Sequence, residues 1–157
     1  MGTNHMGRQS IRFPQPPVVR GFASVAGKKE REGPLGDQFT ATVQDTTFGE
    51  KSWERAERRM QQMTLELALE KAGLTDADLD AAFAGDLLNQ CIGSSFSLRN
   101  RGVPTLGLYG ACSTMAESLL LAAMSVSGGF ARTALAMTSS HFASSERQYR
   151  FPLGYGG

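Results

Sequence analysis

The chain has 157 residues, and its 16 Lys and Arg nearly balance its 15 Asp and Glu, so its charge gives no electrostatic case for nucleic-acid binding. This length is enough for one domain with its own hydrophobic core. No apolar run reaches the ~20 residues that span a bilayer, and the N-terminus lacks the continuous apolar core of a secretory signal. The 2 cysteines and 2 histidines match no zinc-binding spacing. The default expectation is a reduced, soluble, intracellular protein without a metal site.

The N-terminal residues 1–13 are expected to be a disordered leader or a cloning scar, because they begin with a polar, glycine-containing stretch without periodicity. Residues 14–157 are expected to form the domain. The prolines at 14–17 favour extended backbone, and the alternation over residues 18–25 predicts a strand with a possible break at Gly21. Residues 27–37 are typical of a charged loop that ends in a turn.

The first long helix is predicted from Ser52 to Ala72, because apolar side chains recur at helical spacing from Trp53 to Leu67. Ser52 can cap the start of this helix, and Gly73 is a natural residue just past its end. The sequence of residues 75–78 then resembles a capping box that opens one more helical turn.

The second part of the chain alternates between strands and helices. Strands are predicted at 81–84, 105–109 and 133–138, and helices at 90–100 and from Cys112 to Gly128. Strand, helix and strand in this order form a crossover unit, which predicts parallel strands with right-handed connections. The helix after Cys112 is apolar nearly all round, so we expect it to be buried between layers.

Cys112 lies in the segment Gly110-Ala111-Cys112-Ser113-Thr114, between a predicted strand and a predicted helix. The unpaired N–H groups and the positive dipole end of a helix start favour a thiolate there. The hydroxyls of Ser113 and Thr114 can bind free backbone groups or an anion. The segment is therefore an activated nucleophile, an anion-binding pocket descended from one, or a strand–helix joint closed by a small buried cysteine.

Ligands of parallel sheets bind beyond the carboxyl ends of the strands. The polar residues at or just after such ends are Asp86, Asn89, Cys112, Ser113, Ser139, Ser140 and His141. Their coincidence predicts a binding site around Cys112.

The chain resembles the thiolase and β-ketoacyl synthase superfamily, whose nucleophilic cysteine opens a buried helix between two strands. Within that superfamily, it is more similar to the stage V sporulation protein AD family of spore-forming bacteria. The residues that carry this resemblance are those at 23–30, 32–36, 53–58, 84–90 (AGDLLNQ), 110–114 (GACST), 138–141, 146–152 and 155–157.

The resemblance implies a thiolase-like layered α/β fold with a mixed, mostly parallel sheet, of which the chain is the N-terminal, nucleophile-bearing half. Members of the family are much longer than this chain. The superfamily's second half, which carries its catalytic His and its His or Asn partner, is missing here, so we interpret the chain as an N-terminal portion.

The resemblance also implies a non-enzymatic sporulation protein without a cofactor. It would bind dipicolinic acid, free or as the calcium chelate, and support its uptake into the developing spore. Its expected place is peripheral at the inner spore membrane, beside membrane-embedded stage V sporulation proteins of the same complex. The resemblance also implies a homodimer through the edge strand at 133–138, since the corresponding strand of the superfamily pairs across a two-fold axis. A bare edge would be an aggregation hazard.

The predicted ligand-binding residues are Cys112, Ser113, Thr114, Asp86, Asn89, His141, Arg147 and Arg150. Each arginine can clamp one carboxylate in a bidentate way, or it belongs to a solvated loop. His141 either donates to a carboxylate or caps a strand end. Two other functions stay open: an acyl-thioester condensing or acyl-transfer enzyme that uses Cys112, and a structural subunit that tethers a channel complex.

Overall fold

The computed structural model describes residues 4–156, with side chains over residues 4–149. Its strands are β1 (His5–Met6), β2 (Ser10–Ile11), β3 (Val25–Gly27), β4 (Ala41–Val43), β5 (Ala81–Gly85), β6 (Thr105–Leu108) and β7 (Ala134–Thr138). Its helices are α1 (Lys28–Arg31), α2 (Trp53–Ala72), α3 (Ile92–Leu98), α4 (Thr114–Ser127) and α5 (Phe142–Gly156).

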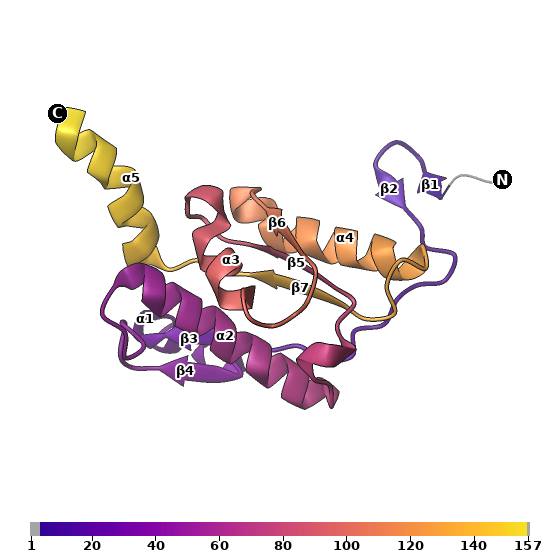
Figure 1. The fold of residues 1–157 in the computed structure, drawn as a ribbon, viewed down its shortest axis with the longest axis horizontal. Coiled ribbons are helices and arrows are strands. Elements are labelled where there is room, and N and C mark those ends of the chain that lie inside the picture. Colours follow the sequence, from indigo (N-terminus) through magenta and orange to yellow (C-terminus); the bar gives the residue numbers. More distant parts are fainter. Residues whose placement is uncertain (1–3, 157) are drawn as a thin grey trace.

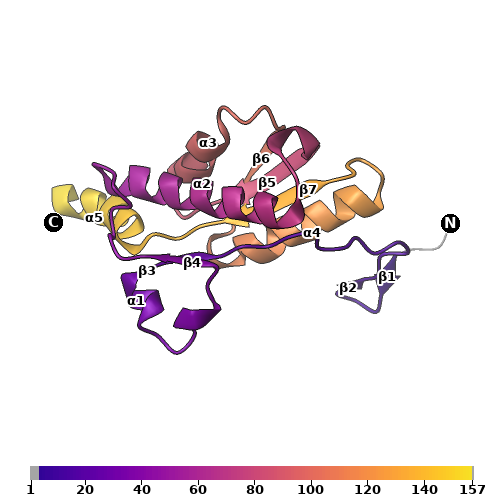
Figure 2. The ribbon, with the colours of Figure 1, turned by 90° about the horizontal axis from the view of Figure 1, so that it is seen from below.

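The central sheet has three parallel strands in the order β6-β5-β7. Figures 1 and 2 show α2 and α3 on one face of this sheet and α4 on the other. The core between the sheet and the α2–α3 layer includes Leu65, Ala82, Ala84, Leu98 and Met137. The predicted α/β fold with parallel strands and crossover helices is confirmed.

The predicted helix over residues 52–72 is also confirmed as α2, because both of its ends carry the expected caps. The Ser52 hydroxyl accepts a hydrogen bond from the Arg55 N–H at 3.3 Å. Gly73 is left-handed with φ 66°, and the Leu74 N–H donates to the Leu69 carbonyl, which closes a Schellman-type end. The capping box at residues 75–78 is present as well.

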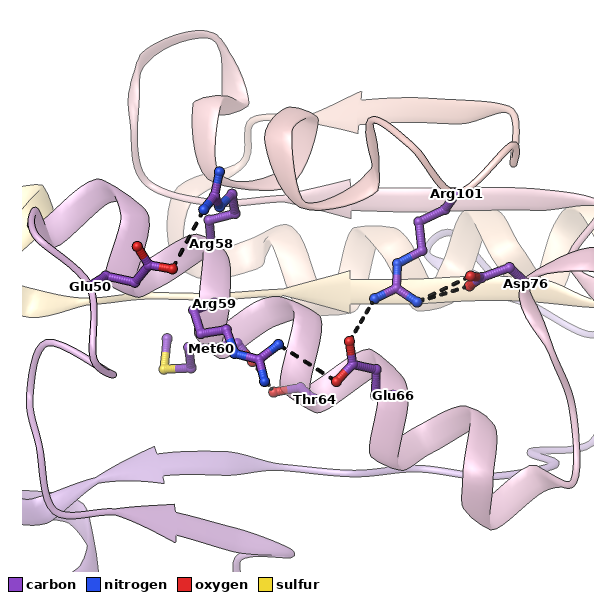
Figure 3. Close-up of polar contacts among 8 residues, drawn as sticks. All are labelled: Glu50, Arg58, Arg59, Met60, Thr64, Glu66, Asp76 and Arg101. Atoms are coloured by element: carbon purple, nitrogen blue, oxygen red, sulfur yellow. Dashed lines mark hydrogen bonds and ion pairs between the residues drawn. The ribbon is translucent and has the colours of Figure 1, made fainter.

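Ion pairs fasten the outer side of α2 to its neighbours (Figure 3). The Arg101 guanidinium lies 3.1 Å from Glu66 on α2 and 3.2 Å from Asp76. Arg59 also pairs with Glu66, at 3.7 Å. The Arg101 side chain is only 16% exposed and has two carboxylate partners. It therefore connects the segment after α3 to α2 and to the turn that follows α2.

The predicted strand at residues 18–25 is wrong over most of its length. Only Val25–Gly27 forms a strand, β3, and it pairs in parallel with β4, which the sequence did not predict. The preceding segment lies along α2, where a Cβ on Gly21 would be 2.8 Å from the Ala68 carbonyl oxygen. Val18 and Val19 stay exposed, because this segment has no strand partner within the described residues.

The predicted loop at residues 27–37 contains regular structure instead. Helix α1 occupies Lys28–Arg31, and a 3₁₀ turn covers Gly36–Gln38. Arg31 closes the segment, because its guanidinium donates to the Gly36 carbonyl and pairs with Asp37 at 2.6 Å. The pattern of charges along the sequence does not predict these contacts of Arg31.

Residues 5–11, within the stretch expected to be a leader or cloning scar, form the short antiparallel hairpin β1–β2. The division into residues 1–13 and 14–157 stays a prediction. No helix among the described residues has both the length and the apolar character that crossing a bilayer requires.

The expectation that the helix after Cys112 is buried between layers is wrong for this structure. The inner face of α4 packs on β5 and β7 through small residues such as Ser118 and Ala122. Its outer face exposes Met115, Leu119, Leu120 and Met124, each by 37–49%. A helix that is apolar all round needs cover on both sides, and the described residues supply only the sheet.

Candidate functional site

The carboxyl ends of the three parallel strands lie at one edge of the sheet. Gly85 is in register with Leu108 of β6 and with Thr138 of β7. The residues that follow, Asp86 and Ser139, therefore begin at the same edge, as the sequence predicted. The side chains of the predicted site residues nevertheless point into different environments.

Cys112 lies where the sequence placed it, in a turn between a strand and a helix. A 3₁₀ turn at Ala111–Ser113 connects β6 to α4, and the free Cys112 thiol is exposed. Ala111 precedes it with a left-handed φ of 50°, a conformation that costs a non-glycine residue about 1–2 kcal/mol. The second cysteine differs, because Cys91 is buried, donates to the Leu108 carbonyl at 3.1 Å, and has its thiol pKa raised by burial.

The two hydroxyls beside Cys112 serve the turn itself. The Ser113 Oγ lies within hydrogen-bond distance of the Gly110 carbonyl, at 2.8 Å, and of the Glu117 carboxylate. The Thr114 hydroxyl accepts from the Gly110 N–H at 3.2 Å. Glu117 thus brings a negative charge to the start of α4, where an anionic ligand would bind.

Gly85 allows β5, β6 and the start of α4 to approach each other closely. A Cβ at this position would lie 2.1 Å from the Leu108 carbonyl oxygen and 2.6 Å from the Thr114 Cγ2. The glycine of the AGDLLNQ segment is therefore required by the packing beneath the Cys112 turn.

Asp86 is fully buried and serves the structure of its own loop. One carboxylate oxygen accepts from the Leu88 N–H at 2.9 Å, and the other accepts from the N–H and the hydroxyl of Ser94, both at 2.7 Å. Asn89 contributes its backbone N–H, which donates to Gln148 of α5 at 2.8 Å.

A second buried carboxylate, which the sequence analysis missed, lies on α2. Glu57 has no exposed surface and accepts hydrogen bonds from Ser139, at 2.6 Å, and from Ser144. Burial raises the pKa of the Glu57 carboxyl, while these two hydroxyls and the charge of His141 act in the opposite direction. A signal was available, because Glu57 follows Ala56 and precedes Met60 on the apolar side of a predicted helix.

The His141 side chain contacts the loop that precedes α2 and the first residue of that helix. Its Nε2 lies 2.8 Å from the Thr46 carbonyl and therefore donates to it, and its ring lies 5.5 Å from that of Trp53. Its buried Nδ1 has no hydrogen-bond partner among the described residues.

The predicted arginine clamp lies on a helix, α5, and not in a loop. Arg147 pairs with Glu54 at 3.1 Å while 61% of its side chain stays exposed. The Arg150 side chain lies outside the described residues. Helix α5 begins at the strand ends and extends away from the body of the molecule (Figure 1), and Tyr149 fastens it by donating to the Leu87 carbonyl at 2.9 Å.

Two comparisons with known proteins bear on this arrangement. The family described as Stage V sporulation protein AD (SpoVAD) matches residues 7–157. The curated "Stage V sporulation protein AD" of Bacillus subtilis (strain 168) is 44% identical over 151 residues. The chain belongs to the stage V sporulation protein AD family. It is thus a member of a sporulation protein family, as its motifs predicted, and the alignment covers 96% of this chain and 45% of that relative.

Two cavities of the chain have no residue of the Cys112 turn in their lining. One, of about 310 Å³, lies between α3 and β6 and is lined in part by Ser94, Arg99 and Thr105. The other, of about 500 Å³, lies between the N-terminal segment and the end of α4. Within residues 4–156, no three His, Cys, Asp or Glu side chains are grouped so that they could hold a metal ion.

Proposed function

We propose that the chain is the N-terminal portion of a non-enzymatic protein that binds dipicolinic acid, free or as its calcium chelate, and supports its uptake into the developing spore. Its membership of a sporulation family carries this proposal. The geometry supports a binding role, because the Cys112 turn is exposed at the carboxyl edge of a parallel sheet.

Dipicolinate suits this edge of the sheet if Arg147 leaves its ion pair with Glu54 to bind a ligand carboxylate. Dipicolinate is a flat dianion at neutral pH, so it needs directed donors and positive charge. Arg147 is exposed enough to turn from Glu54 to a carboxylate, and the start of α4 offers backbone N–H groups.

The proposed setting is the inner spore membrane, with the protein peripheral to membrane-embedded stage V partners. A homodimer would pair the free edge of β7, which carries only β5 as a strand partner among the described residues. A size measurement on the protein, with charged substitutions at the partly buried positions of β7, such as Ala136, tests this pairing.

The direct test is calorimetric titration of the full-length protein with dipicolinate, with and without calcium. Arg147→Gln should weaken binding by about 2 kcal/mol, the scale of a charge-assisted hydrogen bond, whereas Cys112→Ala should retain most of the affinity. Arg55→Gln, on the exposed side of α2, is the matched control. Equal binding by wild type and Arg147→Gln would remove the clamp, and failure of wild type to bind would favour a purely structural subunit.

An acyl-transfer enzyme is the second candidate, favoured by the exposed thiol at the start of α4. Acyl transfer also needs a general base, and the His141 ring is bonded to the Thr46 carbonyl. Mass spectrometry after incubation with acyl-coenzyme A decides this question. Time-dependent acylation of Cys112, absent in Cys112→Ala, would support the enzyme.

A further inference from the structure

Gln61 of α2 lies between the two buried carboxylates at the carboxyl edge of the sheet. Its side-chain nitrogen donates to the Ser139 hydroxyl at 2.6 Å and to the Ser94 hydroxyl at 3.2 Å. Ser139 in turn donates to Glu57, and Ser94 donates to Asp86. One amide group therefore serves two serines, Ser94 on α3 and Ser139 in the loop after β7, and each serine serves its own carboxylate.

The hydrogen bonds to the carboxylates fix the orientation of the Gln61 amide. Ser139 gives its single proton to Glu57 and Ser94 gives its own to Asp86, so both serines accept from the Gln61 nitrogen. The Gln61 side-chain oxygen is also used, because it accepts from Ser97 of α3 at 2.6 Å. A flipped amide would place two acceptors face to face at both serines, so only one orientation of Gln61 fits.

The network is buried and bridges separate elements of the fold. Gln61 is 1% exposed, as is Ser94, and both carboxylate residues have no exposed surface. Ser94 lies on α3, the helix of the connection that follows β5, and Ser139 follows β7. A buried polar group is costly when it loses its partner, so a change at one serine should reach the other through the shared amide.

We propose that Gln61 is a positioning residue whose side-chain amide couples α3, and through the Ser94–Asp86 hydrogen bond the loop after β5, to the loop after β7. These loops carry Asp86, Asn89 and His141, all of them at the carboxyl edge of the sheet. The coupling is a property of the chain's own loops, so it stands whether or not dipicolinate binds at this edge.

The test measures amide hydrogen exchange in the full-length protein and asks whether a change at Ser94 reaches Ser139. The Ser139 N–H donates to the Gly85 carbonyl at 3.2 Å, which makes it a local reporter of the second loop. Ser94→Ala should raise exchange at Ser139 about three- to tenfold, the factor expected when one buried hydrogen bond is lost. Ser94→Thr keeps the hydroxyl and should restore protection.

Gln61 itself is tested with a matched neighbour. Gln61→Leu should raise exchange in both loops and abolish the effect of Ser94→Ala on Ser139. Gln62→Leu is the control, since Gln62 is the same residue type on the same helix but is partly exposed. If Ser94→Ala changes exchange only around residue 94, the proposal is overturned. If Gln61→Leu does not fold, Ser94→Ala still tests the proposal, because an effect confined to the region around residue 94 overturns it.

Discussion

Helices α2 and α4 pack on opposite faces of the same sheet, yet they differ in which side chains they bury and which they expose. Helix α2 carries Arg59 and Glu66 on its outer side and buries Glu57 and Gln61 within the structure. Helix α4 buries small residues such as Ser118 and exposes large apolar ones on its outer side. The comparison teaches that α2 forms an outer surface suited to water, whereas the apolar outer face of α4 is the kind of surface that marks an interaction site.

The largest expected effect is a difference in unfolding free energy between a buried leucine of α2 and an exposed leucine of α4. Leu65 on α2 is 2% exposed, and Leu65→Ala should lower the free energy of unfolding by about 2–5 kcal/mol. Leu119 on α4 is 49% exposed, and Leu119→Ala should cost less than about 1 kcal/mol. Urea denaturation of both variants measures the difference. Equal costs would mean that the outer face of α4 is covered in solution.

The next effect is the pH dependence of stability that comes from Glu57, the buried carboxylate of α2. Because the folded-state pKa of Glu57 is raised, the folded protein holds this proton more tightly than the unfolded chain. Its contribution to stability is present below the unfolded pKa and is lost as pH rises through the folded pKa. Glu57→Gln should remove this part of the pH dependence, which thermal unfolding across that interval would reveal.

Exposed carboxylates provide the control for the sign of that effect. Hydrogen bonds from Thr47 and Gly49 lower the pKa of Asp45. Its contribution is therefore present above the unfolded pKa and is lost as pH falls through the folded pKa, the reverse of Glu57. If Asp45→Asn and Glu57→Gln changed the pH profile in the same direction, the assignment of Glu57 as a protonation-linked buried group would be wrong.

A smaller effect compares how the two helices begin. Ser52 caps α2 through its hydroxyl, so Ser52→Ala should cost about 1 kcal/mol. Ser113 precedes α4 but does not cap it, because its hydroxyl lies against Gly110 and Glu117. Ser113→Ala should therefore cost clearly less in chemical denaturation. A larger loss for Ser113→Ala would show that the turn before α4 depends on this hydroxyl.

The smallest effect is electrostatic and lies at the Cys112 turn. Removing the Glu117 charge should strengthen dipicolinate binding by about 0.3–1 kcal/mol, the usual size of a charge effect at a helix end. Glu117→Gln titrated at two salt concentrations measures this gain, which salt should reduce. Glu146→Gln on α5 is a charge-matched comparison. Unchanged affinity in Glu117→Gln would place the ligand away from the start of α4.

The sequence by itself determined those elements that are specified by neighbouring residues, such as capped helices and turns. Ser52 and Gly73 bound α2 because caps act within one turn, and the strand–turn–helix context of Cys112 followed from two adjacent periodic segments. The family motifs were determined by residue identity alone. The parallel direction of the strands followed from the crossover rule, so Asp86 and Ser139 were predicted to lie at the same edge of the sheet.

Only the tertiary structure decided what those residues contact. Val18 and Val19 are β-branched residues of the kind enriched in strands. A strand nevertheless forms only where another backbone pairs with it. The helix after Cys112 is apolar all round, but burial depends on which layers are present. Glu57 and Gln61 became partners of Ser139, some 80 residues later, because packing α2 over the strand ends leaves buried polar groups that must find hydrogen bonds from whatever lies opposite.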